Sequence, residues 1–395
     1  MPPLYKHQAE FLEKNPDKVI MAFEAGTGKS RTAIEWLKIK KVGLPLIIVT
    51  KAIKQKWHDD LKKWGYKEDY ILLTKEEFKK EPPDNLQYID ALIVDEAHNF
   101  ASPLFIAKMR SQVSEALYKL IENKPNMPIL LLTANPVRSS PANLHSLLIF
   151  RGVNISWAKW RDRFYHLVRR PYLPRPAFEP IKGWQKMMIP IIEKYCHVAL
   201  MRDCADVPIH EYQNIDIELN NETLGRINDL KFEVWEPMKL WCAEHRLENG
   251  DEKLEWIKDF AKGRRKIVII CKYTEQILSY EKELNKDRET FVLNGQTKDQ
   301  GEVIKNAQES PECFLIVQAQ VSAGYDLDQF STMIFASCSW SWVDHSQCHA
   351  RINRIHNLHR NEYIYLHAGP KDYAVIESLE LKQDFDVTQI TNKVK

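Results

Sequence analysis

The 395-residue sequence lacks long apolar runs, a secretory leader and any large excess of charge. Its longest apolar runs, such as "PLIIV" and "PILLL", have the length of strands, whereas a membrane-spanning helix needs about 20 apolar residues. The opening, "MPPLYKHQAEFLEKNPDKV", has no apolar segment of the kind that a secretory signal requires. We therefore expect a cytoplasmic protein with no membrane partner. Because the net charge is only +2, a nucleic acid would have to bind a local basic surface.

The sequence also lacks Cys-x-x-Cys pairs, internal repeats and low-complexity tracts. Seven scattered cysteines are typical of reduced intracellular thiols. Cys338, His345, Cys348 and His349 form the tightest metal-like cluster, but their spacing matches no common zinc site. We favour an ordinary packing role for these four side chains.

Short apolar runs alternate with amphipathic segments along the chain. Runs at 46–50, 91–96 and 128–133 predict buried strands, and residues at helical spacing lie between them. A second set of buried strands is predicted at 266–272, 313–319 and 332–337. This alternation predicts an α/β fold of mostly parallel sheets with helices on both faces. We expect one lobe over 1–205, with a helical segment at 151–200 in which no strand is obvious, and a second over 206–395, with a helical insertion at about 220–262.

The segment "FEAGTGKS" (23–30) resembles a phosphate-binding loop, because it follows a predicted strand and precedes a predicted helix. Gly26 and Gly28 would let the backbone amides turn inward, Lys29 would meet the β- and γ-phosphates, and Ser30 would bind magnesium. Phe23 stands where the strict pattern has glycine. Alone, the segment could equally be an ordinary glycine turn before a helix.

A pair of acids ends the predicted strand in "ALIVDEAH". Asp95 stands where nucleotide-hydrolysing sheets hold magnesium, and Glu96 could orient and deprotonate the attacking water. An acid pair that caps a helix is the alternative, but its position downstream of a phosphate loop favours the catalytic interpretation.

Together these motifs resemble superfamily-two helicases and translocases, and specifically the Snf (Swi/Snf-like) branch in a minimal phage or bacterial form. The resemblance covers nearly the whole chain and implies two RecA-like lobes with an ATP cleft between them. It is carried by "LYKHQAEFL" (4–12), "LLLTANPVRSSPANLHSLLIF" (130–150) and "QCHARINRIHN" (347–357). In that branch an acidic residue followed by glutamate commonly precedes the loop, so Phe23-Glu24 departs at its first position only.

The resemblance assigns roles residue by residue. The catalytic residues that it implies are Lys29, Asp95, Glu96, Gln347, Arg351 and Arg354. The ATP-binding residues that it implies are Gln8, Glu24, Ala25, Gly26, Thr27, Gly28, Lys29, Ser30, Gly324 and Asp326. The residues that it implies for coupling hydrolysis to movement are Thr133, Ala134 and Asn135. The residues that it implies for nucleic-acid contacts are Thr50, Lys51, Lys54, Lys56, Thr74, Gly295, Thr297 and Ser322. Magnesium would be held by Ser30 and Asp95.

Three positions depart from the pattern of the branch. Asn135 stands where threonine is usual, Ser322 where glycine is frequent and Asp326 where asparagine is usual. Arg351 and Arg354 keep the pattern, and because they lie three residues apart they would share one face of a helix and could both reach the γ-phosphate.

The stretch "WAKWRDRFYHLVRR" (157–170) interleaves aromatic and basic residues. It predicts an amphipathic helix that packs its aromatics on the first lobe, or a nucleic-acid contact, and both interpretations can hold at once.

The function that these motifs predict is an ATP- and magnesium-dependent translocase on double-stranded or branched DNA, working in repair, recombination or replication. The alternatives are an RNA helicase of the DEAH type and a binding adaptor with little turnover. Thr-Ala-Asn at 133–135 and Ala350 favour DNA, since the RNA enzymes usually have Ser-Ala-Thr and glycine there. We expect a monomer that a protein partner could direct. No strand-separating element is legible, so translocation or branch remodelling is expected over conventional unwinding.

Overall fold

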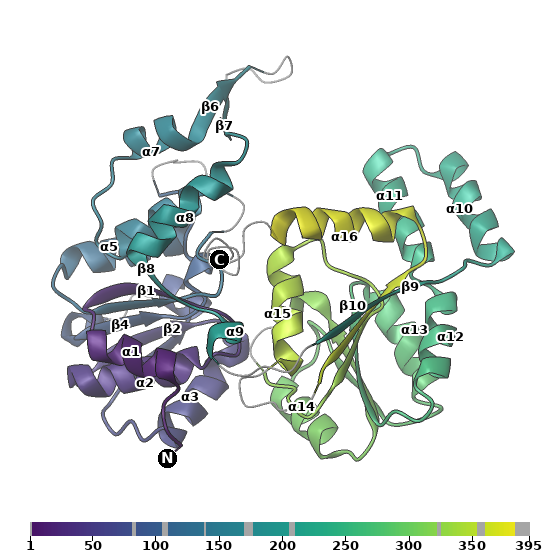
Figure 1. Cartoon of the computed structure of the whole chain (residues 1–395), viewed down its shortest axis with the longest axis horizontal. Helices are drawn as coiled ribbons and strands as arrows, with labels where there is room; N and C mark the ends of the chain where they lie inside the picture. Colours follow the sequence, from purple (N-terminus) through teal and green to yellow (C-terminus); the bar gives the residue numbers. More distant parts are fainter. Residues whose placement is uncertain are drawn as a thin grey trace. The chain divides into compact units, whose positions relative to one another are not determined.

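The computed structural model describes residues 2–80, 84–104, 110–137, 140–169, 177–204, 210–321, 325–353 and 360–383. The chain forms two compact units, which divide between Asp206 and Val207. Each unit is built on one six-stranded parallel sheet (Figure 1). The predicted α/β architecture is therefore confirmed. In the described ranges, every helix is too short or too polar to cross a bilayer.

The sheet of the first unit has the strand order β3-β2-β4-β5-β1-β8. Its strands are β1 (Lys18–Phe23), β2 (Pro45–Val49), β3 (Ile71–Thr74), β4 (Ala91–Val94), β5 (Ile129–Leu132) and β8 (Cys196–Ala199). The helices of this unit are α1 (Lys6–Lys14), α2 (Lys29–Lys40), α3 (Lys54–Lys63), α4 (Lys75–Lys80), α5 (Gln112–Asn123), α6 (Pro141–Phe150), α7 (Trp157–Phe164), α8 (Trp184–Tyr195) and α9 (Met201–Cys204). Short 3₁₀ turns are η1 (Lys51–Ile53), η2 (Asp84–Tyr88) and η3 (Ala97–Asn99).

Two apolar layers cover the two faces of this sheet. Val19, Met21 and Phe23 of β1 pack with α1, α2 and α3, whereas Ile20 and Ala22 pack with α5, α6 and α8. This alternation follows from the period of two in a strand. The strands are apolar throughout because both faces are buried, and polar side chains are therefore left to the loops at the carboxyl ends of the strands.

The prediction that residues 151–200 are helical without strands is wrong in part. This segment contains α7 and α8, but also an antiparallel pair formed by β6 (Tyr165–Val168) and β7 (Ala177–Pro180), and the sheet strand β8. The nearby prolines argued against a strand. They are tolerated here because in a two-stranded sheet both strands are edges, where a missing N–H breaks no ladder.

The sheet of the second unit has the strand order β11-β12-β10-β13-β14-β9. Its strands are β9 (Glu211–Asp216), β10 (Lys266–Cys271), β11 (Thr290–Leu293), β12 (Cys313–Gln318), β13 (Thr332–Phe335) and β14 (Glu362–His367). The helices of this unit are α10 (Asn221–Glu233), α11 (Pro237–Glu248), α12 (Asp251–Phe260), α13 (Thr274–Leu284), α14 (Gln300–Glu309), α15 (Trp342–Ile352) and α16 (Pro370–Gln383), and η4 (Ala319–Val321) is a 3₁₀ turn.

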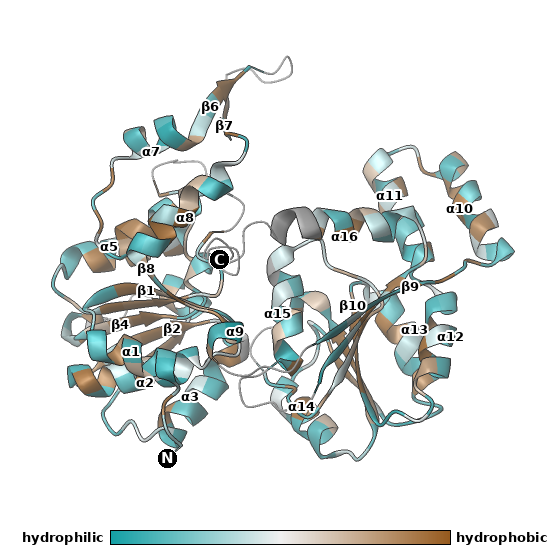
Figure 2. Cartoon of the chain, in the orientation of Figure 1, coloured by the Kyte–Doolittle hydropathy of each residue, from teal (hydrophilic) through white to brown (hydrophobic). Residues whose placement is uncertain are grey.

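Helices again cover both faces of the second sheet. Helices α12 and α13 pack on one face, and α14, α15 and α16 pack on the other. Helix α10 differs from these because none of its residues is buried, and it packs chiefly on α11. Figure 2 shows the apolar colour concentrated in the sheets and polar colour on the outer helix faces.

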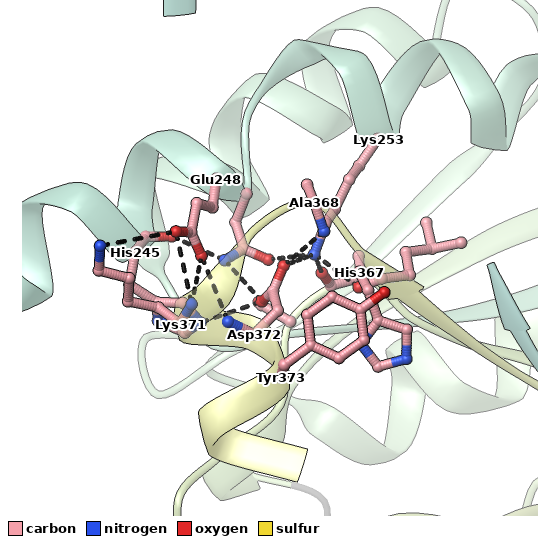
Figure 3. A network of polar contacts seen from close by, with 12 residues as sticks. His245, Glu248, Lys253, His367, Ala368, Lys371, Asp372 and Tyr373 are labelled. Carbon is pink, nitrogen blue, oxygen red and sulfur yellow. Dashed lines mark hydrogen bonds and ion pairs between the residues drawn. The ribbon is translucent and has the colours of Figure 1, made fainter. Parts of the chain in front are cut away.

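A buried polar network fastens α11, α12 and α16 to this sheet (Figure 3). The fully buried ammonium of Lys253 donates hydrogen bonds of 2.7 Å to Asn249, Asp372 and the carbonyl oxygens of Ala336 and Leu366. Burial opposes ionisation of Asp372, but the Lys253 charge and a hydrogen bond from His245 lower its pKa to about 2. An unpaired charge here would cost several kcal/mol, about 3–5 in comparable buried pairs, so the network fixes one arrangement of the three helices.

Candidate functional site

The phosphate loop connects β1 to α2 in the first unit. Gly26 and Gly28 have φ angles of 88° and 86°, which favour glycine, and α2 begins directly afterwards at Lys29. The Lys29 ammonium donates to the carbonyl oxygens of Phe23, at 3.0 Å, and Glu24, at 3.3 Å. The loop therefore places a cation and the amino end of a helix at one point, an arrangement that can bind phosphate groups.

Phe23 occupies the corner of the loop for a packing reason. Its side chain is fully buried, and its ring packs edge-on against Phe11 and His7. The next residue, Glu24, donates its N–H to the Ala199 carbonyl at 2.8 Å and accepts a hydrogen bond from Met201 N–H at 2.7 Å. A buried aromatic ring and two Glu24 hydrogen bonds, one from its backbone N–H and one to its side-chain Oε2, thus fix the corner that glycine fills in the strict pattern.

Gln8 contacts the backbone of the phosphate loop. Its side chain is fully buried, and its Nε2 donates to the carbonyl oxygens of Gly28, at 3.3 Å, and Thr27, at 3.5 Å. His7 Nε2 lies 2.9 Å from the same Thr27 oxygen. A Cβ atom on Gly28 would lie 2.3 Å from Gln8 Nε2 and would displace this amide, and the φ angle of 86° itself favours glycine. The expected role of Gln8 in adenine recognition stays a prediction.

Asp95 lies directly after β4 and is nearly buried. Its Oδ2 accepts a hydrogen bond from Trp57 Nε1 at 2.8 Å, and its Oδ1 accepts one from Glu96 N–H at 2.8 Å. Burial raises the pKa of Asp95 to about 6, and the Glu96 charge adds to the rise, while the Trp57 hydrogen bond and the Lys29 charge oppose it. Strands β4 and β1 both neighbour β5 in the parallel sheet, so the acid pair and the loop lie at the same edge of the sheet.

The second acid is connected to the coupling motif through His98. Glu96 adopts a left-handed backbone conformation, with φ 47°, and its Oε2 lies 3.3 Å from His98 Nδ1. The same nitrogen lies 3.0 Å from Thr133 Oγ1, which also accepts a hydrogen bond from Asn135 N–H at 3.0 Å. Glu96, His98 and Thr133 form a continuous contact path. The sequence analysis did not include His98 among the site residues, although it is the last residue of the Asp-Glu-Ala-His motif.

The site fits a magnesium ion. A nearly buried carboxylate whose pKa is raised by burial and by a neighbouring acid is stabilised by an added cation. Ser30, which resemblance assigns to magnesium, is the second residue of α2. Among the described residues no group of three or more His, Cys, Asp or Glu side chains forms a metal site. A site with one protein carboxylate is typical of magnesium bound together with a nucleotide, which supplies the other oxygens.

The cysteine and histidine cluster of α15 is arranged by aromatic packing. His345 and His349 pack against Phe335, and burial lowers the pKa of His345 to about 4. The Cys338 and Cys348 side chains are buried in the apolar layer around α15.

The predicted nucleic-acid residues of the first unit lie at the ends of β2 and β3. Thr50 directly follows β2, exposed Lys51 begins η1 and partly exposed Lys56 lies in α3. Lys54 forms an ion pair of 2.8 Å with Glu77, which also accepts a hydrogen bond from Thr74 N–H at 2.6 Å. The Lys54 hydrogen bond, with the Thr74 N–H, lowers the pKa of Glu77 to about 2. The structure thus connects the two predicted contact segments through Glu77, which the sequence analysis did not identify.

The closing motif of the second unit places Arg351 near Tyr325. Arg351 is nearly buried, and its guanidinium donates to the carbonyl oxygens of Tyr325, at 3.0 Å, and Gln347, at 3.1 Å. Asp326 follows Tyr325 and accepts, through its carbonyl oxygen, a hydrogen bond from Gln308 at 2.8 Å. The structure therefore brings together three of the predicted residues, Gln347, Arg351 and Asp326. The predicted residues that lie outside the described ranges are Ser322, Gly324 and Arg354.

Two further predicted contacts lie beyond β11. Gly295 N–H donates to the Gln318 side chain at 3.1 Å, and Thr297 Oγ1 accepts a hydrogen bond from Asn294 N–H at 3.0 Å. These bonds shape the loop between β11 and α14, with Gly295 exposed. The structure leaves their role in binding a prediction.

Comparison with known proteins decides the class of the second unit. Residues 252–357 match the helicase conserved C-terminal domain. The second unit is therefore similar to a helicase C-terminal domain. The match runs from α12 through α15 and includes Gln347 and Arg351, so the closing motif lies within the matched residues. No curated protein sequence matches the chain.

Two solved structures extend the comparison to the first unit. The Hef helicase domain of Pyrococcus furiosus is 13% identical, with a TM-score of 0.55, and the match covers 95% of this chain and 98% of that one. The SWI2/SNF2 ATPase core of Sulfolobus solfataricus in complex with dsDNA is 16% identical, with a TM-score of 0.41, over 99% of this chain and 94% of that one. With the helicase domain, the Hef likeness confirms the superfamily-two helicase fold with two RecA-like lobes.

Proposed function

We propose that this helicase-type protein is a DNA translocase that couples ATP hydrolysis to movement on double-stranded or branched DNA. The observation that carries the proposal is the contact path from Glu96 through His98 to Thr133, beside a complete phosphate loop. A protein that only binds nucleotide has no need of a connection between its hydrolytic acid and a coupling motif.

The residues of the first unit have distinct tasks in this proposal. The loop amides and Lys29 bind the phosphates of ATP, and Glu96 accepts the proton of the attacking water. Ser30 and Asp95 would hold magnesium, which supplies neutralisation of phosphate charge. Glu96 Oε2 is buried and contacts His98 Nδ1 at 3.3 Å, so the carboxylate proposed to accept the water proton is also the one that begins the contact path. A change at Glu96 would be transmitted through His98 to Thr133, and from there along the chain to α6.

The resemblance also gives the second unit a role in hydrolysis. Arg351, with Arg354 beside it in the sequence, would neutralise charge on the γ-phosphate, and arginines in this role accelerate hydrolysis by roughly 10³–10⁵. In this structure the Arg351 guanidinium is held by the Tyr325 carbonyl. Reaching a phosphate would require exchange of that bond for a charge-assisted one, which is the stronger of the two.

DNA as the track rests on the Snf-type sequence signature. Thr133, Ala134 and Asn135 occupy the coupling motif, and Ala350 precedes Arg351 in the closing motif. Both differ from the pattern of RNA helicases with the same acid box. Exposed Lys51, with Lys54 and Lys56 in the following helix, supplies candidate phosphate contacts at the end of β2. A pathway in repair, recombination or replication, and a protein partner, belong to the same proposal.

Steady-state ATP hydrolysis by the purified chain tests the proposal. The rate would be measured without nucleic acid and with double-stranded DNA, single-stranded DNA or RNA, beside the Glu96→Gln variant. We expect stimulation by double-stranded DNA that is lost in Glu96→Gln, while the variant still binds a fluorescent ATP analogue. Stimulation by RNA alone would instead favour the RNA helicase, and nucleotide and DNA binding without stimulated hydrolysis would favour the adaptor.

A further inference from the structure

An exposed apolar pair lies on the strand pair β6–β7 of the first unit. Leu167 and Phe178 are directly opposite each other in the register, and their exposed fractions are 55% and 51%. Figure 1 shows the two strands projecting beyond α7 and α8, away from the sheet of this unit, and Figure 2 shows apolar colour along them. Burial of each large apolar side chain would gain roughly 1.5–3 kcal/mol, so an adjacent exposed pair marks a contact surface.

The inner end of the strand pair is anchored to the body of the unit. The Tyr165 hydroxyl lies 2.6 Å from Ser140 Oγ and accepts a hydrogen bond from Ala142 N–H at 3.0 Å. Ile181 N–H donates to the carbonyl oxygen of buried Phe164 at 3.0 Å. An isolated two-stranded hairpin is only marginally stable in water, so these anchors give the exposed pair a fixed position. They connect it to the amino end of α6, which follows the coupling motif in the chain.

The charge around the pair is positive. The Arg161 guanidinium lies over the Phe178 ring at 5.0 Å. Over 157–169 and 177–186 the acidic residues are only Asp162 and Glu179. The basic residues over the same ranges are Lys159, Arg161, Arg163, Arg169, Lys182 and Lys186. This surface therefore suits a polyanion.

The exposed apolar surface of the second unit differs in charge. Phe232, in the last turn of α10, and Trp235, between α10 and α11, are 80% and 90% exposed. Residues 221–239 hold three basic and four acidic side chains, so this region has no attraction for a polyanion. Among these two surfaces, only the β6–β7 pair combines exposed apolar side chains with a positive surround.

We propose that Leu167 and Phe178 stack on nucleobases at a DNA branch or end, with Arg161 and Arg163 on the adjoining phosphates. This inference rests on the proposed function and names its substrate class as branched DNA. The apolar faces of DNA are the faces of its bases, and in an intact duplex these are covered by stacking. Insertion between stacked bases costs a few kcal/mol per step, whereas at a branch the terminal base face is already open. An aromatic ring that stacks on one base contributes enough to select the open face.

The sequence analysis identified no strand-separating element, and the exposed pair on β6 and β7 is a candidate for an element that contacts a DNA branch. The structure places the antiparallel strands β6 (165–168) and β7 (177–180) in a segment where no strand was obvious from the sequence. A surface that stacks on the open base pair of a branch would hold the junction while the motor moves the duplex arms.

Binding to matched DNA molecules tests the inference. Fluorescence anisotropy would compare a closed dumbbell duplex, which has no open ends, with a three-way fork of the same duplex sequence. Wild-type protein should bind the fork about tenfold more tightly, in line with base stacking on an aromatic side chain. The double variant Leu167→Ser/Phe178→Ser should bind both molecules with the affinity that wild-type protein has for the dumbbell. A matched control, Phe232→Ser/Met238→Ser, alters exposed apolar residues of the second unit and should keep the preference for the fork.

A photo-crosslink identifies the contact itself. A 5-iodouracil base at the branch should crosslink to the β7 peptide that contains Phe178, and the crosslink should be absent with Phe178→Ser. Fork preference that persists in the double variant would overturn the inference, as would equal loss of binding to the dumbbell and the fork. Wild-type binding to duplex DNA without fork preference would overturn this inference alone, whereas absence of any DNA binding would overturn the proposed function as well. All four altered side chains are exposed, and an unchanged melting temperature would verify the fold of each variant.

Discussion

The Nδ1 atom of His98 lies 3.0 Å from the hydroxyl oxygen of Thr133, and both side chains are buried. Through this contact the acid motif after β4 meets the coupling motif after β5. Because the two strands are neighbours in the sheet, their carboxyl ends bring the two motifs together. A change in the hydrogen bonding of Glu96 can therefore reach Thr133 without a rearrangement of the backbone.

Replacement of Thr133 tests that contact. Thr133→Val keeps the shape of the side chain and removes the hydroxyl, and with it the contact to His98 Nδ1 and the hydrogen bond from Asn135 N–H, at a stability cost of about 1–3 kcal/mol. We expect basal ATP hydrolysis to persist and stimulation by DNA to fall by roughly tenfold or more, about 1.4 kcal/mol in the barrier. Thr133→Ser restores the hydroxyl and should restore stimulation. Equal stimulation in Thr133→Val and wild type would show that the contact is not part of coupling.

The pKa of Asp95 leads to a pH-dependent stability. The carboxyl has an ordinary pKa of 3.8, and burial raises it to about 6 in the folded protein. The folded state therefore binds more protons than the unfolded state between these values, and wild-type stability falls as the pH rises from about 4 to about 6. Asp95→Asn has no such group, so its stability relative to wild type should rise over this window by up to about 3 kcal/mol.

Urea unfolding of the magnesium-free protein at a series of pH values measures this difference. The gap between Asp95→Asn and wild type should level off above pH 6, where the folded-state carboxyl is ionised. A gap that does not change with pH would mean that Asp95 keeps its ordinary pKa.

A second prediction about stability concerns substitutions at Phe23. Conversion to the glycine of the strict loop pattern would remove a fully buried ring from the layer between β1 and α1, which costs roughly 3–5 kcal/mol. Phe23→Leu keeps most of the volume and should cost less than about 1.5 kcal/mol. Chemical denaturation measures both, and binding of a fluorescent ATP analogue to the folded fraction should be the same in all three proteins. Tighter nucleotide binding by Phe23→Gly would show that the ring impairs the loop.

Lys51 and Lys54 should contribute unequally to DNA binding. Lys51 is exposed, whereas Lys54 is already paired with Glu77 at 2.8 Å. Each phosphate neutralised by a lysine adds about 0.9 to the slope of log affinity against log salt concentration. Lys51→Ala should lower that slope by nearly this amount, and Lys54→Ala should lower it by less. A larger loss in Lys54→Ala would mean that Lys54 leaves Glu77 when DNA binds.

The sequence allowed good prediction of those parts of the site that are formed by neighbouring residues. The phosphate loop and the acid pair each depend on a strand, a turn and a few side chains in succession, so the apolar runs and the glycine spacing were sufficient. Contacts between distant residues could not be predicted in this way. Trp57 donates to Asp95 across 38 positions of the chain, and no local pattern indicates that bond.

The packing role of Phe23 and the pairing of β6 with β7 could not be predicted either, because both depend on tertiary contacts. Whether an aromatic residue before a loop is buried depends on α1, which packs over it. The run Tyr165–Val168 has residues that favour strands, but its partner strand lies beyond a proline-rich stretch. Pairing of this kind depends on tertiary anchors, such as the contact of the Tyr165 hydroxyl with Ser140 at the amino end of α6.

Movement along DNA is the central claim, and triplex displacement tests it most directly. A third DNA strand bound in the major groove of a linear duplex would carry a fluorophore, and its release would be followed after addition of ATP and magnesium. We predict ATP-dependent release by wild-type protein, and no release by Glu96→Gln or with a non-hydrolysable analogue. DNA-stimulated hydrolysis without any release of the third strand would contradict the account, because ATP would then be consumed without movement.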